Sequence, residues 1–374
     1  MKVVFCGGGT GGHVYPALTA AAALRELAGR DNVSMLYVGV KGKIDAELVA
    51  REGIAFKAVS ARPLRTGDFE GTARGALSAV SGTAEGVGIL NGFKPDVVFA
   101  TGGYGSVGVA MAAKLLQKPL LLFLPDVEAG MAVKLLARVA DKIAVTVSPA
   151  LDAVQREKAL VTGYPVRPAF FGAGRYDSRA RLGLHQELPV LLVSGASSGA
   201  SAINSAVAAM APDFLRLGQL LHLSGQPDYD SLMAQRASLP DDIRDRYHLY
   251  PYLHEDMAFA MGAADVAVMR SGASTLGELP AARLPAILVP GEYEGWDQSP
   301  NARYLESEGA AVMLPQARLA DELKPAVMSL LGDSDRRSKM QEALARLARP
   351  DAALNLAQLL MKMAGAPQRA QVQG

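Results

Sequence analysis

Short β-type runs that alternate with helical stretches constrain the fold of this chain more than any other feature. A first series of such runs occupies residues 2–6, 34–38, 97–101, 120–124 and 142–145. A second series occupies residues 190–194, 219–223, 247–250, 266–269 and 286–289. Strands that alternate with helices form parallel sheets, and several of these runs are apolar on both faces, as fully buried strands are. The pattern predicts an α/β protein with two parallel sheets.

A segment punctuated by one glycine and two prolines, residues 163–168, separates the two series. A chain of 374 residues is a natural length for two domains. We therefore expect a first domain over residues 1–164 and a second over residues 165–347. The polar tail, residues 365–374, carries Gly, Pro and Gln, and we expect it to be disordered.

The composition removes several classes of protein. The chain has 38 basic and 37 acidic residues, so its net charge of +1 gives no global field for nucleic acid. A single cysteine, Cys6, excludes a disulfide within the chain, which fits a reducing compartment. No apolar run approaches the roughly 20 residues that span a bilayer, and we find no signal-peptide pattern at the N-terminus. We expect a cytoplasmic protein that touches a membrane only at its surface.

The first predicted strand ends in a turn of five glycines and one threonine, residues 7–12, and His13 follows at the start of a helix. Glycines allow a sharp turn and a close ligand, and free N–H groups at a helix start favour an anion. The formal dinucleotide fingerprint is weak here, because residues 37–40 lack the acidic residue expected after the second strand. A neutral His13 suits a general base, and the alternative is a capping or packing histidine.

Three further turns rich in glycine or hydroxyl groups follow predicted strands, at residues 101–106, 195–201 and 270–278. The turn at residues 195–201 lacks the lysine of a P-loop, which disfavours triphosphate hydrolysis. Glu278 lies one to two turns into a helix, where it could accept both ribose hydroxyls or simply be solvated. A polar segment, residues 297–302, offers hydrogen-bond donors and acceptors for sugar hydroxyls. The alternative is an ordinary polar helix start, which would have the same composition. No Asp-x-Asp-type donor motif stands after a predicted strand and there is no His/Cys cluster, so we expect no metal ligands.

These motifs, taken together, resemble one enzyme family. The sequence reads GGGTGGHVYPAL at 7–18, TGGYGS at 101–106, VTGYPVRP at 161–168, SGASSGASAIN at 194–204, RSGASTLGE at 270–278 and DQSPNA at 297–302. Over roughly residues 1–362 the chain resembles the MurG family, the N-acetylglucosaminyltransferases of peptidoglycan assembly.

The resemblance implies a GT-B fold, with two Rossmann-like domains across a cleft and a C-terminal helix, 348–364, that returns to the first domain. It implies inverting transfer of N-acetylglucosamine from UDP-N-acetylglucosamine to a lipid-diphosphate-linked N-acetylmuramoyl-pentapeptide. It also implies no active-site metal or other cofactor, and a peripheral position on the inner face of the cytoplasmic membrane.

The resemblance also assigns roles residue by residue. His13 would be the general base, with Asp126 as the alternative catalytic group. Gly102, Gly103 and Tyr104 would hold the acceptor diphosphate. Thr10, Gly11 and Gly12 would face the acceptor and the transferred sugar. The remaining donor-binding residues would be Arg167, Ser197, Leu253, Ala273, Ser274, Thr275, Glu278, Asp297, Gln298 and Asn301.

Several positions depart from the family pattern. Residues 123–126 read Phe-Leu-Pro-Asp where the family has His-Glu-Gln-Asn, in a stretch expected to line the cleft beside the acceptor. Tyr164 and Ser198 stand where the family has Asn and Gln. These departures leave two alternatives open. One is a related transferase with a different acceptor, and the other is a sugar-nucleotide-binding homologue without activity. An epimerase of the same fold is disfavoured, because the glycine-rich motifs supply few carboxylates for its chemistry.

Overall fold

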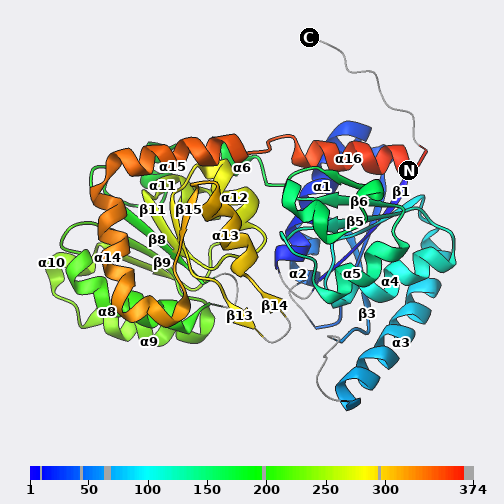
Figure 1. Ribbon diagram of the computed structural model, residues 1–374, viewed down its shortest axis with the longest axis horizontal. Helices are drawn as coiled ribbons and strands as arrows, with labels where there is room; N and C mark the ends of the chain where they lie inside the picture. The colour runs from blue at the N-terminus through cyan, green and yellow to red at the C-terminus, as the bar shows by residue number, and fades with distance from the viewer. Residues whose placement is uncertain (9–10, 43–44, 63–68, 196–198, 294–295, 366–374) are drawn as a thin grey trace, which may run out of the picture. The chain divides into compact units, whose positions relative to one another are not determined.

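A computed structural model describes residues 1–8, 11–42, 45–62, 69–195, 199–293 and 296–365 (Figure 1). The chain forms two compact units. Unit 1 comprises Met1–Val166 together with the chain from Arg349 onward, and unit 2 comprises Arg167–Ala348. All but the first residue of the predicted disordered tail, residues 366–374, lie outside the described ranges, as do Thr10 and Ser197.

Unit 1 is built on a parallel sheet in which seven strands are described, in the order β3-β2-β1-β4-β5-β6-β7. These strands are β1 (Lys2–Cys6), β2 (Ser34–Val40), β3 (Ala55–Val59), β4 (Val97–Ala100), β5 (Leu120–Leu124), β6 (Lys142–Val145) and β7 (Ala159–Val161). All five strands predicted for this half are present. The sequence analysis missed β3 and β7, because these edge strands are partly exposed and lack a continuous apolar run.

Helices cover both faces of this sheet. The described ones are α1 (Gly11–Ala28), α2 (Asp45–Arg51), α3 (Phe69–Phe93), α4 (Tyr104–Leu115), α5 (Met131–Val139) and α16 (Ala352–Met363), with 3₁₀ turns η1 (Arg30–Asn32), η2 (Ser148–Ala153) and η3 (Arg156–Lys158). The C-terminal helix α16 packs beside α1, at the opposite end of the sequence (Figure 1). Helices α3 and α4 approach so closely that a Cβ on Gly108 would lie 2.5 Å from the backbone of Gly82.

Unit 2 repeats the plan, with six described parallel strands in the order β10-β9-β8-β11-β12-β15. Its strands are β8 (Val190–Ser194), β9 (Gln219–Leu223), β10 (Tyr247–Tyr250), β11 (Val266–Met269), β12 (Ala286–Leu288) and β15 (Ala311–Met313), with a small hairpin of β13 (Glu292–Tyr293) and β14 (Trp296–Asp297). Its helices are α6 (Ala169–Gly172), α7 (Arg175–Arg181), α8 (Ser201–Phe214), α9 (Gln226–Ala237), α10 (Asp241–Arg244), α11 (Met257–Ala263), α12 (Thr275–Ala282), α13 (Ser299–Ser307), α14 (Leu319–Gly332) and α15 (Ser334–Leu347), with η4 (Gln316–Arg318). The predicted α/β class, with two Rossmann-like parallel sheets, is confirmed.

The strand order places the ligand-binding edge of each sheet. In both units the chain winds one way from the first strand and then reverses, so the first and fourth strands are neighbours. Open α/β sheets bind ligands at the carboxyl ends of the strands on either side of that reversal. Cys6 pairs with Ala100 in unit 1, and Ser194 pairs with Met269 in unit 2. The four glycine-rich turns therefore begin at these two reversal points.

A buried arginine, Arg179, holds the amino ends of the two central strands in the unit 2 sheet. The Arg179 side chain is fully buried, and its Nε and Nη1 donate to the carbonyls of Ala263 and Leu188 at 3.0 and 3.1 Å. Its Nη2 donates to Asp265 Oδ2 at 2.8 Å, and the same oxygen accepts from the Val190 N–H at 2.7 Å. Arg179 thereby ties α7 to the residues that lead into β8 and β11.

We expect Arg179→Met to lower the free energy of unfolding by about 3–5 kcal/mol, because the partly buried Asp265 carboxylate loses its fully buried partner and keeps only an exposed one. Arg175→Met is the matched control. Arg175 contacts the same carboxylate at 3.2 Å, but its side chain is 48% exposed. This control should cost less than about 1 kcal/mol. Urea unfolding followed by circular dichroism measures both, and equal losses would contradict the role given to Arg179.

Candidate active site

The two glycine-rich turns of unit 1 interlock at the reversal point. Gly102 and Gly103, which follow β4, have φ values of 83° and 73°, in the region that favours glycine. A Cβ on Gly103 would lie 2.9 Å from the Gly8 carbonyl oxygen and 3.2 Å from His13 Cδ2. Side chains at these positions would push the second turn away from the first. The glycines of the TGGYG segment therefore make room for the His13 ring.

The His13 ring has a defined tautomer. Its Nδ1 lies 2.8 Å from the carbonyl oxygen of Thr101, and because a carbonyl only accepts, Nδ1 carries the hydrogen. In the neutral ring, Nε2 is then left with a lone pair, which is the atom that a general base requires. His13 is half-buried in the first turn of α1. The structure thus brings together His13, Gly11, Gly12, Gly102 and Gly103, all predicted site residues.

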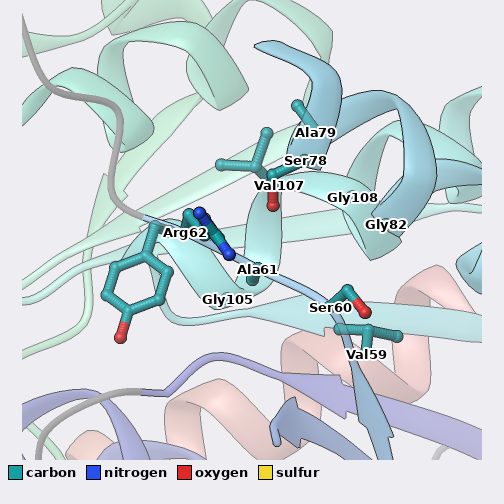
Figure 2. A pocket seen from close by; sticks show the side chains of 11 residues that line it. Val59, Ser60, Ala61, Arg62, Ser78, Ala79, Gly82, Gly105, Val107 and Gly108 are labelled. Atoms are coloured by element: carbon teal, nitrogen blue, oxygen red, sulfur yellow. The ribbon is translucent and has the colours of Figure 1, made fainter. Parts of the chain in front are cut away.

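Tyr104 begins α4 beside this group. It is half-buried, and burial, followed by the charge of Asp45, raises the pKa of its phenol. Figure 2 shows a small hollow lined by Arg62, Ser78 and Gly108. Tyr104 lines the same hollow. The hollow has room for about 10 Å³, roughly one water molecule, so it does not accommodate a sugar or a diphosphate.

The burial of residues 123–126 differs from what the sequence analysis predicts. Phe123 and Leu124 are the last residues of β5 and are fully buried, so the prediction that they line a cleft beside the acceptor is wrong for these two. The Phe123 ring instead packs against Tyr164, with ring centroids 6.1 Å apart, and against Phe99 at 6.3 Å. Asp126 lies just after the strand and is half-buried. It stays a candidate catalytic group.

In unit 2, the turn after β11 carries the candidate phosphate and ribose contacts. Thr275 begins α12, its hydroxyl donates to the Gly272 carbonyl at 2.6 Å, and Ala273 is buried within the turn. The Glu278 N–H donates to the Ser274 carbonyl at 2.8 Å, which extends the helix start. Glu278 is partly buried, and burial raises the pKa of its carboxyl to about 7 against the opposing effects of Ser274 and Arg167. Such a carboxyl titrates near neutral pH.

Arg167 and Leu253 come from segments that meet in the same unit. Arg167 Nη2 donates to the carbonyl of His254 at 3.3 Å, and its guanidinium stacks over the Phe170 ring at 5.2 Å. Leu253 precedes His254 and is half-buried. Because Arg167 also acts on the Glu278 carboxyl, three predicted donor-binding residues form one neighbourhood.

The polar side chains of residues 297–301 bond to neighbouring backbone, and their contact with the donor sugar stays a prediction. Gln298 and Asn301 are buried: Gln298 Oε1 accepts from the Gly291 N–H at 2.9 Å, and Asn301 Nδ2 donates to the Ser271 carbonyl at 3.0 Å. The two amides therefore tie the loop after β12 to the turn after β11. Asp297 is exposed and accepts from the Ser299 N–H at 2.8 Å, which lowers the pKa of its carboxyl.

A buried polar network that the sequence analysis missed supports the start of α8. His222 Nε2 donates to Asn204 Oδ1 at 2.9 Å, and its Nδ1 accepts from the Tyr247 hydroxyl at 2.9 Å. Asn204 Nδ2 and the Ser201 hydroxyl both donate to Asp228 Oδ2 at 2.7 Å. Burial lowers the pKa of His222 to about 3, so its ring is neutral. The available signal was a histidine in an otherwise apolar strand, since such a buried ring needs polar partners.

Two absences hold for the part of the chain that the structure describes. Among those residues, no group of three or more His, Cys, Asp or Glu side chains could hold a metal ion. No helix within the same ranges is long and apolar enough to cross a membrane.

This chain is similar to known proteins over nearly its whole length. Residues 3–145 match the glycosyltransferase family 28 N-terminal domain, and residues 190–356 match the family 28 C-terminal domain. A UDP-N-acetylglucosamine--N-acetylmuramyl-(pentapeptide) pyrophosphoryl-undecaprenol N-acetylglucosamine transferase of Roseiflexus sp. is 40% identical, over 96% of this chain and 94% of that protein. The protein of the same name from Listeria monocytogenes serovar 1/2a is 35% identical, over 97% and 99%.

Solved structures give the fold. The crystal structure of Acinetobacter baumannii MurG superimposes with a TM-score of 0.72 at 23% identity, over 96% of this chain and 99% of that one. The UDP-GlcNAc 2-epimerase of Neisseria meningitidis, bound to UDP-GlcNAc, gives a TM-score of 0.70 at 13% identity, over 97% and 100%. At these identities the likeness shows the GT-B fold alone, which transferases and epimerases share. The two domain matches and the near full-length relatives decide between them, and the chain belongs to the MurG family of glycosyltransferase family 28.

Proposed function

We propose that this glycosyltransferase transfers N-acetylglucosamine from UDP-N-acetylglucosamine to a membrane lipid-diphosphate-linked N-acetylmuramoyl-pentapeptide, a step in peptidoglycan precursor synthesis. The observation that carries the proposal is the 40% identity, over 96% of the chain, to a transferase whose name states this reaction. The defined tautomer of His13 is consistent with it, because the reaction needs a base for the acceptor hydroxyl.

We assign the acceptor side to unit 1 and the donor side to unit 2. Unit 1 contains His13 and the turn of Gly102 to Tyr104, and its core is completed by α16. Unit 2 contains Arg167, Leu253 and the start of α12 with Glu278. An acceptor diphosphate suits the glycine turn of unit 1, and a nucleoside diphosphate suits the amides of the α12 first turn.

The proposed reaction is a direct displacement. His13 Nε2 takes the proton of the acceptor hydroxyl, whose oxygen attacks the anomeric carbon from the face opposite UDP. The bond from that carbon to the diphosphate oxygen breaks, the configuration inverts, and negative charge moves onto the leaving diphosphate. Backbone amides at the start of α12 and the Arg167 guanidinium would stabilise that charge.

We place the enzyme on the cytoplasmic face of the cell membrane, in contact through α5. One face of this helix exposes Met131, Lys134, Leu135 and Arg138, at helical spacing. Apolar side chains interleaved with basic ones on a helix surface favour the interface of an anionic bilayer. The family resemblance would place the membrane contact between positions 61 and 93, but that segment carries only three basic residues, Arg62, Arg65 and Arg74, so α5 is the stronger candidate.

The experiment that tests the proposed function is UDP release, measured with and without the lipid-diphosphate-linked muramoyl-pentapeptide in anionic vesicles. We expect release to depend on the acceptor and to yield a disaccharide product. Release that ignores the acceptor would point to a hydrolase or epimerase. Absence of release despite UDP-sugar binding would point to a binding protein.

The double variant Lys134→Glu/Arg138→Glu separates membrane contact from chemistry. It should weaken vesicle binding, because each basic residue near an anionic surface contributes about 1 kcal/mol. UDP affinity in solution should not change, since α5 belongs to unit 1. Unaltered vesicle binding would remove α5 from the proposal and leave the reaction standing.

Glu278→Gln should weaken UDP binding and stabilise the free protein at high pH. Loss of charged hydrogen bonds to ribose costs roughly 1.5–3 kcal/mol of binding. The raised pKa means that ionisation opposes folding: the wild type loses stability as pH rises from the ordinary carboxyl value of 4.5 towards about 7. The gain in melting temperature of the variant should therefore be larger at pH 8 than at pH 5.

Calorimetric titration with UDP and thermal melts at the two pH values measure these effects. The control is Glu308→Gln, at an exposed position after α13 in the same unit, and it should change neither quantity. Undiminished UDP affinity in Glu278→Gln would refute the ribose contact.

His13→Gln should lower turnover by on the order of 10²–10⁴-fold, with UDP affinity nearly unchanged and only a small fall in melting temperature, because the base and its one hydrogen bond to Thr101 are lost. Single-turnover rates, calorimetry and thermal melts give the three readouts. His185→Gln, at an exposed histidine of unit 2, is the matched control.

Two other results have distinct meanings. A variant that loses stability along with turnover would make His13 a structural cap. A stable and active His13→Gln enzyme, paired with a severe loss in Asp126→Asn, would move the role of base to Asp126.

A further inference from the structure

The helical turn that carries His13 lacks one of its internal hydrogen bonds. Pro16 lies inside α1 and has no N–H, so the carbonyl of Gly12 receives no helical hydrogen bond from position 16. Gly11 and Gly12 add backbone freedom at the same place. Because a base must be held within a fraction of an ångström of its target, this turn needs partners from elsewhere in the fold.

Thr101 supplies two of these partners. It follows β4, is fully buried, and lies 88 positions along the chain from His13. Its hydroxyl donates to the His13 carbonyl at 2.7 Å, and its own carbonyl accepts from His13 Nδ1 at 2.8 Å. A Cβ on Gly7 would lie 2.1 Å from the Thr101 hydroxyl, so the first glycine turn is shaped around this side chain. One residue thus restrains both the backbone and the ring of His13.

Tyr164 supplies the third partner of this helical turn. Its hydroxyl donates to the Gly12 carbonyl at 3.4 Å, the long end of the range, and that carbonyl is the one that Pro16 leaves without a helical donor. The Tyr164 ring is buried against Phe123, and Phe123 continues through Phe99 to the core. The aromatic residue at position 123 therefore supports the phenol that reaches α1.

We propose that Thr101 and Tyr164 are positioning residues for His13: their hydroxyls hold two successive carbonyls of its helical turn, and the Thr101 carbonyl selects its tautomer. Neither residue needs to touch a substrate. The inference rests on the proposed function for its effect on turnover, but the geometry it describes exists in the free protein.

The first test is therefore independent of activity. Protein labelled with ¹⁵N-histidine has five rings, and His13→Gln identifies the signal of His13. At alkaline pH, where histidine is neutral, the wild type should show the Nδ1–H tautomer. Thr101→Val keeps the shape and the carbonyl but removes the hydroxyl that holds the His13 backbone. The released turn should no longer keep the ring on the Thr101 carbonyl, so His13 should shift towards a mixture of tautomers, and Thr101→Ser should restore the wild-type pattern.

The second test uses kinetics. Thr101→Val should lower kcat about 10–100-fold with the KM for UDP-N-acetylglucosamine within roughly threefold, as expected for a misplaced base. Thr101→Ser should recover most of kcat. Tyr164→Phe, which keeps the ring on Phe123, should lower kcat by only about 2–10-fold, because the bond it removes is long.

Thr146→Val is the matched control. Thr146 follows β6 in the same sheet, is buried, and donates its hydroxyl to the Pro125 carbonyl at 2.9 Å. It should lose a similar amount of thermal stability and leave the His13 tautomer unchanged.

An unchanged His13 tautomer and kcat in Thr101→Val would overturn the proposal, as would a Thr101→Ser variant that fails to recover either. Wild-type behaviour of Tyr164→Phe would overturn the part that concerns Tyr164. A shifted tautomer with undiminished turnover would uphold the positioning and refute His13 as the base instead.

Discussion

The pairing register of the two central strands in each sheet is the constraint on which the rest depends. Cys6 lies opposite Ala100, so the turns after β1 and β4 start side by side, and Thr101 can reach His13. Ser194 lies opposite Met269 in the same way in unit 2. A slip of one residue would turn every side chain of a strand to the opposite face. Strand pairing, rather than loop sequence alone, assembles the candidate site.

The sequence predicted the central strands well because buried parallel strands are continuous apolar runs. All ten predicted strands exist, whereas five described strands were missed. The mixed and partly exposed residues of β3, β7 and β15 give no clear pattern, and β13 and β14 have only two residues each. The glycine turns could be located for the same reason, because each follows a recognisable strand.

The partners of polar side chains were harder to predict. Gln298 and Asn301 were predicted as sugar contacts, but the sequence did not indicate that each also bonds the backbone of a neighbouring loop. His222 gave no functional signal, although it holds the helix that follows the third glycine turn. Such partners are set by segments distant in sequence, which local pattern and propensity do not report.

The C-terminal helix has a consequence for synthesis of the protein. Helix α16 buries Leu356 and Leu360 in unit 1, where α1 buries Leu24. Unit 1 therefore cannot close its core until nearly the entire chain has left the ribosome, while unit 2, contiguous over Arg167–Ala348, can close earlier. Domains of a nascent chain usually fold from the N-terminus onward. Here the half of the protein translated first must wait, with part of its apolar surface uncovered, for the half translated last.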